Sequence, residues 1–220
     1  IYDNCQEKYI KFNIYDNGFI PTESIDMMKK IYEFTKKVGS LESKYSSCRN
    51  KKEIKDTKSS EYKYPIINIT YGNIGIKYSK INNNKTNEKK LVLPNDSMGY
   101  PIYDKIGTLY PSSSHDFVIY SNNNEQELKQ LQNYFYTNLV FYLINITKTS
   151  QNFFDNKFFS IIPDITKITK EKNITDDFLI KLFKLNKNDL KCLEKYRESG
   201  EGRLSIEKIN EFKNFYIKNE

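Results

Sequence analysis

Residues 117–196 place strand and helix patterns in an order that restricts the fold more than any other part of the chain. A short β-branched run at 115–121 is followed by a stretch at 123–150 whose apolar residues recur with the helical period and include many aromatics. A short apolar run ending in proline, FFSIIPDI at 158–165, comes next, and two capped helical patterns follow at 174–196. An apolar face as wide as that of 123–150 must be buried, and we expect it to pack on a sheet.

The strands of that sheet are expected upstream. Residues 62–79 alternate and are β-branched around a turn pattern at 71–73, and shorter strand patterns follow at 91–94, 102–114 and 115–121. A helix is expected from about Pro21 to Gly39, with Thr22, Glu23 and Ser24 as candidate caps, whereas 41–58 suggests a loop or a frayed helix.

The predicted fold class is therefore α+β. Short, mostly antiparallel strands at about 62–120 are packed by a long aromatic-rich helix at about 123–150, with an N-terminal helix and a small C-terminal helical cluster. Three parts are expected: an N-terminal helix and basic loop at 1–60, an α/β core at 61–170, and a C-terminal helical subdomain at 171–220.

Positive charge is concentrated in one segment. The chain has a formal net charge of +7, but residues 44–90 contain twelve basic and four acidic residues, a surplus of eight, so the remainder is close to neutral. A basic stripe of this kind is typical of a nucleic-acid binder, and a solvated loop is the alternative. Tyrosines at 45, 62, 64, 71 and 78 lie among these lysines and are suited either to stacking on bases or to packing on a sheet face.

The cysteine and histidine content indicates which cellular compartment the chain suits and whether it can bind a metal ion. Cys5, Cys48 and Cys192 are odd in number and widely spaced, which favours free thiols in a reducing, cytoplasmic compartment. His115 is the only histidine and there is no Cys–x–x–Cys pair, so we expect no metal site. No run of 18 apolar residues is present, and we expect no membrane partner.

The sequence contains no recognisable catalytic motif. Acidic–x–Lys triplets of the nuclease type occur at 42–44, 53–55, 56–58 and 88–90, but none follows an apolar strand with a partnered Asp, so a metal-dependent nuclease is a minor alternative. The six prolines are never adjacent and no strand leads into a glycine-rich turn, so the chain lacks the motifs with which DNA methyltransferases bind S-adenosylmethionine and the target amine. We expect no enzymatic activity in this chain.

Several short motifs nevertheless occur in a familiar order. They are YP at 64–65, KLVLP at 90–94, YPIYD at 100–104, HDFVI at 115–119, TSQ at 149–151, FFSIIPDI at 158–165 and TDDFLIKLFKL at 175–185. Over about residues 60–197 the chain resembles the C-terminal target-recognition domain of adenine-specific DNA methyltransferases from type II restriction–modification systems, including fusions with a nuclease. In this family a Rossmann-like catalytic domain precedes the recognition domain, which closes over DNA. The chain starts without Met, and we expect a piece of a longer protein.

The resemblance implies double-stranded DNA as one partner and a catalytic methyltransferase domain, in the same chain or complex, as another. S-adenosylmethionine is implied for the parent enzyme, with no cofactor in this piece. Lysines would contact phosphates and polar loop residues would read bases. The candidate DNA-binding residues are Lys77, Lys80, Lys85, Lys89, Lys90, Tyr71, Tyr78, Asn73, Asn95, Ser97 and His115.

Other functions remain open at this point. A protein-interaction or scaffolding domain would carry the basic segment incidentally, and an RNA-binding domain would need a stacking sheet, for which no known signature is evident. Binding that weakens steeply with salt would favour DNA over scaffolding.

Overall fold

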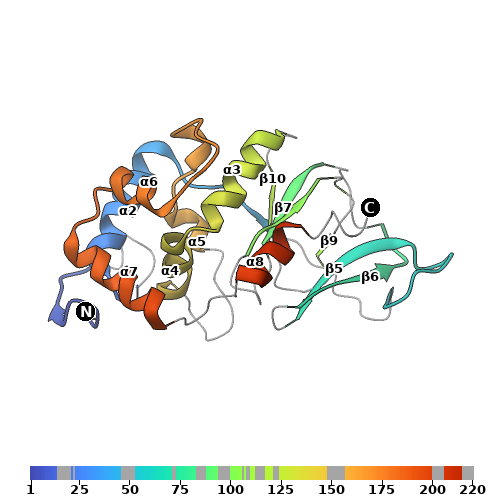
Figure 1. Cartoon of the computed structure of the whole chain (residues 1–220), viewed down its shortest axis with the longest axis horizontal. Coiled ribbons are helices and arrows are strands. Elements are labelled where there is room, and N and C mark those ends of the chain that lie inside the picture. The colour runs from blue at the N-terminus through green and yellow to red at the C-terminus, as the bar shows by residue number, and fades with distance from the viewer. Residues whose placement is uncertain are drawn as a thin grey trace. The chain divides into compact units, whose positions relative to one another are not determined.

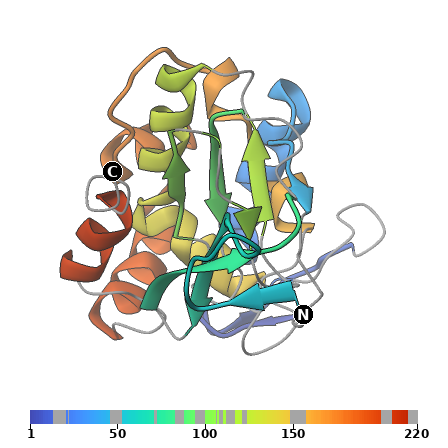
Figure 2. The ribbon, with the colours of Figure 1, turned by 90° about the vertical axis from the view of Figure 1, so that its right-hand side faces the viewer.

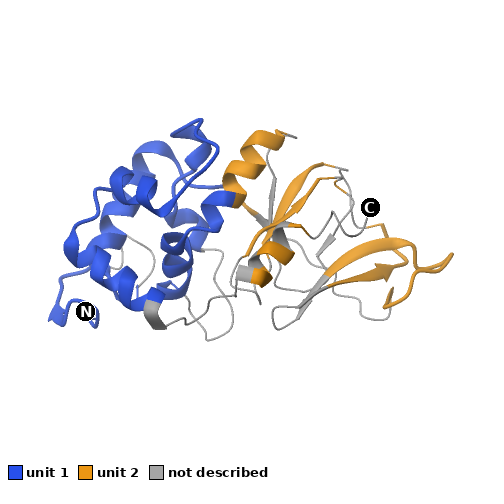
Figure 3. Ribbon diagram, in the orientation of Figure 1, with its two compact units in different colours: residues 1–42, 133–203 blue, residues 43–132, 204–220 orange. Residues whose placement is uncertain are grey.

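The computed structural model describes residues 1–13, 21, 23–45, 53–70, 73–82, 88–93, 100–105, 107, 110–111, 117–120, 124–147, 157–199 and 206–214. The chain forms two compact units, which Figure 3 distinguishes by colour. Unit 1 consists of residues 1–42 and 133–203, and unit 2 of residues 43–132 and 204–220.

This division differs from the expected one at 60 and 170. The N-terminal helix belongs with the later helices, because Leu41 donates its backbone N–H to Ile162 O (3.1 Å) and Ser40 forms an isolated β-bridge with Pro163. The last helix, expected in the C-terminal cluster, instead contacts a strand of unit 2. Both pairings join segments far apart in sequence, which local patterns do not reveal.

Unit 1 is mainly helical (Figure 1). Its elements are the strands β1 (Tyr2–Asp3) and β2 (Lys8–Tyr9), the helices α2 (Ile25–Val38), α4 (Asn138–Ile146), α5 (Lys157–Ile161), α6 (Asp176–Leu182) and α7 (Lys187–Ser199), and the 3-10 helix η3 (Ile165–Lys167). Its core is built from aliphatic and aromatic residues of α2, α4 and α5, which are almost completely buried. Helix α2 presents one apolar face to this core, whereas α4 is buried nearly all round, and the burial of these apolar side chains stabilises the unit.

The predicted N-terminal helix is confirmed as α2, but its first turn is stabilised by a residue that the sequence did not indicate. The side chain of Ser24 accepts no capping hydrogen bond and instead lies 2.5 Å from the hydroxyl of Tyr142. The carboxylate of Asp3 accepts the N–H of Ile25 at 2.8 Å. The helix ends at Gly39, which adopts φ 94°, a left-handed value that favours glycine.

The long helix expected at 123–150 is two helices, α3 (Glu125–Phe135) and α4. Thr137 separates them: its hydroxyl donates to Tyr134 O at 2.8 Å and accepts the N–H of Val140 at 3.3 Å, so the same side chain ends α3 and caps α4. Asp176 adds a second cap, because its carboxylate accepts the N–H groups of Asn138 and Leu139. The prediction of one continuous helix is therefore wrong. Its apolar residues are buried, but those of α4 pack with α6 and α7, where we expected a sheet.

The two late helices are confirmed together with their caps. Thr175 accepts the N–H of Phe178 at the start of α6. Asn186 and Asp189 form a reciprocal capping box at the start of α7, in which Asn186 N–H donates to Asp189 Oδ2 at 2.8 Å and Asp189 N–H donates to Asn186 Oδ1 at 3.1 Å.

Unit 2 contains two four-stranded sheets, whose strands are seen in Figures 1 and 2. One has the order β3–β10–β7–β8 and the other β4–β6–β5–β9. The strands are β3 (Lys44–Tyr45), β4 (Ile54–Lys55), β5 (Tyr64–Thr70), β6 (Asn73–Ser79), β7 (Lys90–Leu93), β8 (Ile102–Asp104), β9 (Tyr110–Pro111) and β10 (Phe117–Tyr120), and helix α8 (Ile206–Lys213) contacts β8.

The expected hairpin at 62–79 is confirmed, since β5 and β6 pair antiparallel from Tyr64↔Ser79 to Thr70↔Asn73. Apart from the parallel pair β5–β9, the pairings between the described strands are antiparallel. The segment 41–58, expected to be a loop or frayed helix, instead contributes the short strands β3 and β4. The predicted α+β class is confirmed by this combination of helices and small antiparallel sheets.

A disulfide joins Cys5 to Cys192 in unit 1, with Cα atoms 5.7 Å apart. The expectation of free thiols is wrong for these two residues, because a 187-residue separation conceals their proximity in the fold. Cys48 lies outside the described residues. Within the described ranges, no helix is both long and apolar enough to cross a membrane.

Candidate nucleic-acid interface

The sheet β4–β6–β5 carries a group of lysines around one buried tyrosine. Tyr62 is 5% exposed, and its ring lies beneath two ammonium groups, with Lys55 Nζ 4.5 Å and Lys80 Nζ 5.0 Å from the ring centroid. A turn fixes the ring, because Tyr62 N–H donates to Ser59 Oγ and Tyr62 O accepts the N–H of Ser59. We call Lys55, Tyr62, Lys63, Lys77 and Lys80 the lysine cluster.

Strand pairing sets the spacing of the lysine cluster. Lys55 of β4 lies opposite Tyr78 of β6, and Lys77 lies opposite Ile66 of β5. Lys80 follows β6 directly and donates its N–H to Glu53 O at 3.1 Å, which holds it beside β4. Because side chains alternate along a strand, Lys77 and Tyr78 point to opposite faces of this sheet. Of the two, Tyr78 shares its face with Lys55.

Two acidic residues partner these lysines at the surface. Lys77 Nζ lies 3.2 Å from Asp56 Oδ1, and Lys80 pairs with Glu61. Their hydrogen bond raises the pKa of Lys80 and lowers the pKa of Glu61. The carboxylates are more exposed than the lysines, at 83% for Asp56 and 59% for Glu61. Ion pairs of this exposure contribute only about 0–1 kcal/mol, so a phosphate can replace the carboxylate at small cost.

The tyrosines of this sheet act as supports. Tyr62 is buried and so cannot stack on a base, while Tyr64 and Tyr78 are half-buried. The ring of Tyr64 lies 5.3 Å from Lys63 Nζ, so it also contacts an ammonium group. An ammonium over an aromatic face gains roughly 0.5–1 kcal/mol at an exposed site, which restricts where the lysine head can lie.

Lys89 belongs to a second group of charges. Its ammonium lies 3.0 Å from Glu125 Oε2, and Lys129 lies 2.7 Å from the other oxygen of the same carboxylate. Hydrogen bonds from Lys129 and then Lys89 lower the pKa of Glu125 to about 2. Two ammonium groups share this one carboxylate, so the group keeps a net charge of +1. The side chain of Lys89 is 35% exposed.

The interpretation of Lys90 as a phosphate ligand is wrong. Its side chain is 1% exposed, and its ammonium lies 2.8 Å from Asp104 Oδ2 and donates to Gly107 O at 3.1 Å. Gly107 N–H in turn donates to Asp104 Oδ1 at 2.7 Å. Lys90 and Asp104 are register partners on β7 and β8, so this ion pair fixes a turn and a strand pair inside unit 2. A fully buried ammonium does not reach a phosphate.

The other predicted site residues are only partly described. The backbone of Asn73 pairs with Thr70 at the end of the β5–β6 hairpin, and the structure does not describe its side chain. Tyr71, Lys85, Asn95, Ser97 and His115 lie outside the described residues. The structure thus places Lys77 and Tyr78 on opposite faces of β6, with Lys80 directly after this strand, while Lys90 lies in β7 of the other sheet and Lys89 directly before it.

Lys55 and Lys63 were not among the predicted site residues, and Tyr62 was predicted only as one of five tyrosines that stack on bases or pack on a sheet face. A usable signal was present in the run Glu61–Tyr62–Lys63–Tyr64, which alternates charge and tyrosine just before a strand. The pairing of β4 with β6, which brings Lys55 to Tyr62, is not visible in a two-residue strand pattern.

The acidic–x–Lys triplets do not assemble a metal site in the described part of the chain. No three His, Cys, Asp or Glu residues there converge on a position where they could hold a metal ion. Asp56 of one triplet pairs with Lys77, and Lys90 of another is buried.

Comparisons with protein-family models, with curated proteins and with solved structures find no match for this chain.

Proposed function

We propose that this chain is a duplex-DNA recognition module of a restriction–modification adenine methyltransferase, with no catalytic motif of its own. The lysine cluster is the observation that carries the proposal: Lys55 and Lys80 hold their ammonium groups over the ring of Tyr62, and Asp56 and Glu61, which partner Lys77 and Lys80, are highly exposed. The serial order of motifs from YP at 64–65 to TDDFLIKLFKL at 175–185 supports the family and thus the kind of nucleic acid.

In this proposal the chain binds and does not react. Lys55, Lys63 and Lys80 contact phosphates, and Lys77, on the opposite face of the sheet, and Lys89 are further proposed phosphate contacts. Asn73, Asn95 and Ser97 remain the proposed base readers, and Lys85, Tyr71 and His115 remain proposed contacts. A catalytic domain in the same chain or complex supplies S-adenosylmethionine and the methyl transfer. A DNA partner implies a cytoplasmic location. Free thiols do not support that location, because Cys5 and Cys192 form a disulfide.

The proposal is tested by the salt dependence of binding. Fluorescence anisotropy with a labelled duplex should show binding at low salt that falls steeply towards physiological salt, because each lysine bound to a phosphate releases counterions. The double variant K55A/K80A should weaken binding to all duplex sequences alike and reduce the magnitude of the log–log salt slope by about 2.

The matched control is K172A/K184A, which removes the same charge from two exposed residues of unit 1. Equal losses in both double variants would show that net charge, and not the lysine cluster, causes binding. Absence of binding by the unaltered chain at low salt would refute the proposal.

A protein-interaction domain is the second candidate function, and one observation favours it. Lys77, Lys80 and Lys89 each have a carboxylate partner within the chain, so the positive surplus is partly neutralised before any ligand arrives. Salt-independent binding of the duplex, or none, is the expected result for this candidate.

A further inference from the structure

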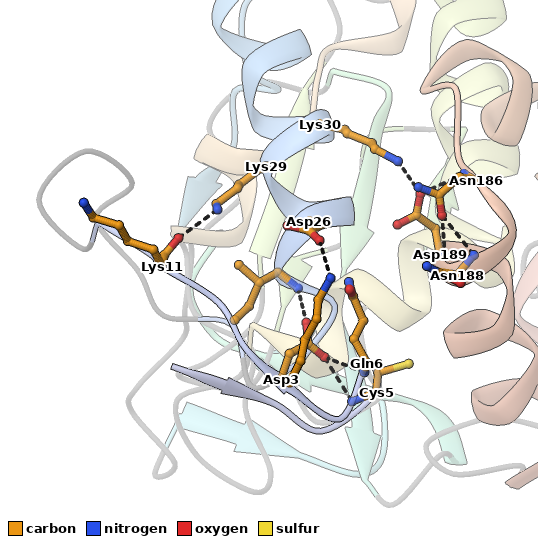
Figure 4. A network of polar contacts seen from close by, with 12 residues as sticks. Asp3, Cys5, Gln6, Lys11, Asp26, Lys29, Lys30, Asn186, Asn188 and Asp189 are labelled. Atoms are coloured by element: carbon orange, nitrogen blue, oxygen red, sulfur yellow. Dashed lines mark hydrogen bonds and ion pairs between the residues drawn. The ribbon is translucent and has the colours of Figure 1, made fainter.

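The disulfide of unit 1 connects the N-terminal hairpin to helix α7. Cys5 lies in the turn between β1 and β2, and Cys192 lies in the middle of α7. Figure 4 shows Cys5 with Asp3 and Gln6 on the hairpin, together with Asn188 and Asp189 of α7. The link is therefore a covalent contact between two segments that share no backbone hydrogen-bond ladder.

A polar pocket opens beside Cys5 of this disulfide. It has a volume of about 370 Å³ and is lined by Cys5, Gln6, Glu7, Lys8, Asn188 and Lys191. Cys192 does not line it and is only 3% exposed. The two cysteines therefore differ in access: a molecule in the pocket meets Cys5, while Cys192 is covered by the protein.

The charge of the pocket favours an anionic ligand. Lys8 and Lys191 line it against the single acidic lining residue Glu7, a surplus of one positive charge among the lining residues, and Asp26 lies 3.5 Å from Lys8 and partly neutralises it. Gln6 and Asn188 add amide groups that can donate hydrogen bonds. Thiolates are the species that attack disulfides, and small cellular thiols also carry carboxylates, so the surplus positive charge at the pocket attracts both the thiolate and the carboxylates.

We propose that Cys5–Cys192 is a thiol–disulfide exchange site that a small anionic thiol enters through this pocket. The external thiolate attacks Cys5 Sγ, the bond between the two protein sulfurs breaks, and the electron pair leaves on Cys192, which then takes a proton from water. A second external thiolate attacks the mixed disulfide on Cys5 and releases the Cys5 thiolate. The cystine gains two electrons, and the two external thiols leave as their own disulfide.

Non-covalent contacts retain the hairpin after this reaction. The carboxylate of Asp3 accepts the N–H groups of Cys5 (3.0 Å), Gln6 (3.1 Å) and Ile25 (2.8 Å), so it joins the hairpin turn to α2. Lys30 joins α2 to α7 through Asp189 at 2.5 Å (Figure 4). Reduction thus removes one link among several, which makes a reversible reaction within a folded unit 1 possible.

The test follows the position and the rate of exchange in the oxidised 220-residue chain with Cys48→Ser, so that the disulfide contains the only cysteines. Glutathione, an anionic thiol, and cysteamine, a cationic one, are added separately, the reaction is stopped with acid, and the mixed disulfide is located by peptide mass spectrometry. Rates are divided by those of the same thiols with hydroxyethyl disulfide, which removes their intrinsic difference in reactivity.

We expect the adduct on Cys5 and a faster normalised reaction with glutathione. K8Q and K191Q should each lower the glutathione-to-cysteamine ratio by about two- to fivefold, while K195Q, an exposed lysine of α7 that does not line the pocket, should leave it unchanged. Circular dichroism before and after reduction checks that the chain stays folded.

Three results would overturn the proposal. They are an adduct mainly on Cys192, equal ratios in K191Q and K195Q, and two titratable thiols in the folded C48S chain after air oxidation.

Discussion

In unit 1, the carboxylates of Asp3 and Asp189 are buried and accept backbone N–H groups, whereas in unit 2, Asp56 and Glu61 are exposed and partner lysines. A buried carboxylate that satisfies several donors is costly to remove, because each donor is then left without a partner. An exposed pair is cheap to break and can exchange with solvent ions. The acids of unit 1 therefore hold the fold together, and those of unit 2 leave nearby lysines available to a ligand.

One pair in unit 2 departs from this contrast. Lys90 and Asp104 are buried like Asp3 and Asp189 of unit 1, although Lys90 contributes to the net positive charge of residues 44–90. The lesson is that a charge counted in a sequence becomes part of a binding surface only if the fold exposes it.

The largest expected effect comes from that pair. Lys90→Met leaves the buried carboxylate of Asp104 without its ammonium and should lower the free energy of unfolding by about 3–5 kcal/mol, measured by urea denaturation. Lys77→Met, which breaks the exposed pair with Asp56, should cost less than about 1 kcal/mol. The double variant K90M/D104N removes both charges and keeps an acceptor for Gly107 N–H, so it should recover part of the loss. Equal effects of K90M and K77M would erase the contrast between buried and exposed pairs.

A smaller loss is expected at Asp3. Asp3→Ala removes the acceptor for three backbone N–H groups and should lower the free energy of unfolding by about 2 kcal/mol. Asp26→Ala provides the control: this residue also lies in the first turn of α2, but its side chain is 39% exposed and its partner Lys8 is 3.5 Å away. Urea denaturation under oxidising conditions compares the two. A loss in D26A as large as that in D3A would mean that charge near the helix end, and not backbone capping, is responsible.

The smallest effect concerns Glu125, whose pKa is lowered from 4.5 to about 2 by Lys129 and Lys89. A carboxyl with a lowered pKa contributes stability at pH values above its unfolded pKa, and this contribution is lost as the pH falls towards its folded pKa. The Tm difference between the unaltered chain and E125Q should therefore shrink as the pH falls from about 4.5 to about 2. Added salt should reduce the same difference at pH 7. A difference that stays constant over this pH range would contradict the assignment.

The parts of the fold that the sequence predicted are those held by near neighbours. Thr175 and the pair Asn186–Asp189 cap helices through residues three positions away, and the β5–β6 hairpin joins adjacent strands, so their patterns are complete within a short window. The sequence did not predict the break at Thr137, because a threonine within a helical apolar pattern does not reveal that its hydroxyl caps the next turn.

The candidate site was harder to predict from the sequence, because its residues come together through contacts between distant segments. The positive segment was visible, but the assembly of Lys55, Tyr62 and Lys80 needs the pairing of β4 with β6, and the burial of Lys90 needs Asp104 on another strand. Likewise, Asp3 caps a helix that begins 22 residues later, and Cys5 meets Cys192 only in the folded chain.

The contact between Asp3 and Ile25 also bears on the order in which unit 1 assembles. A helix whose first donor is satisfied by a distant carboxylate stays frayed at that end until the distant segment arrives. Amide hydrogen exchange at Ile25 should then report the docking of the N-terminal hairpin, with protection gained together with that of Cys5 and Gln6, whose N–H groups share the same carboxylate. One side chain near the start of the chain would thus couple the local opening of two separate segments into a single cooperative event.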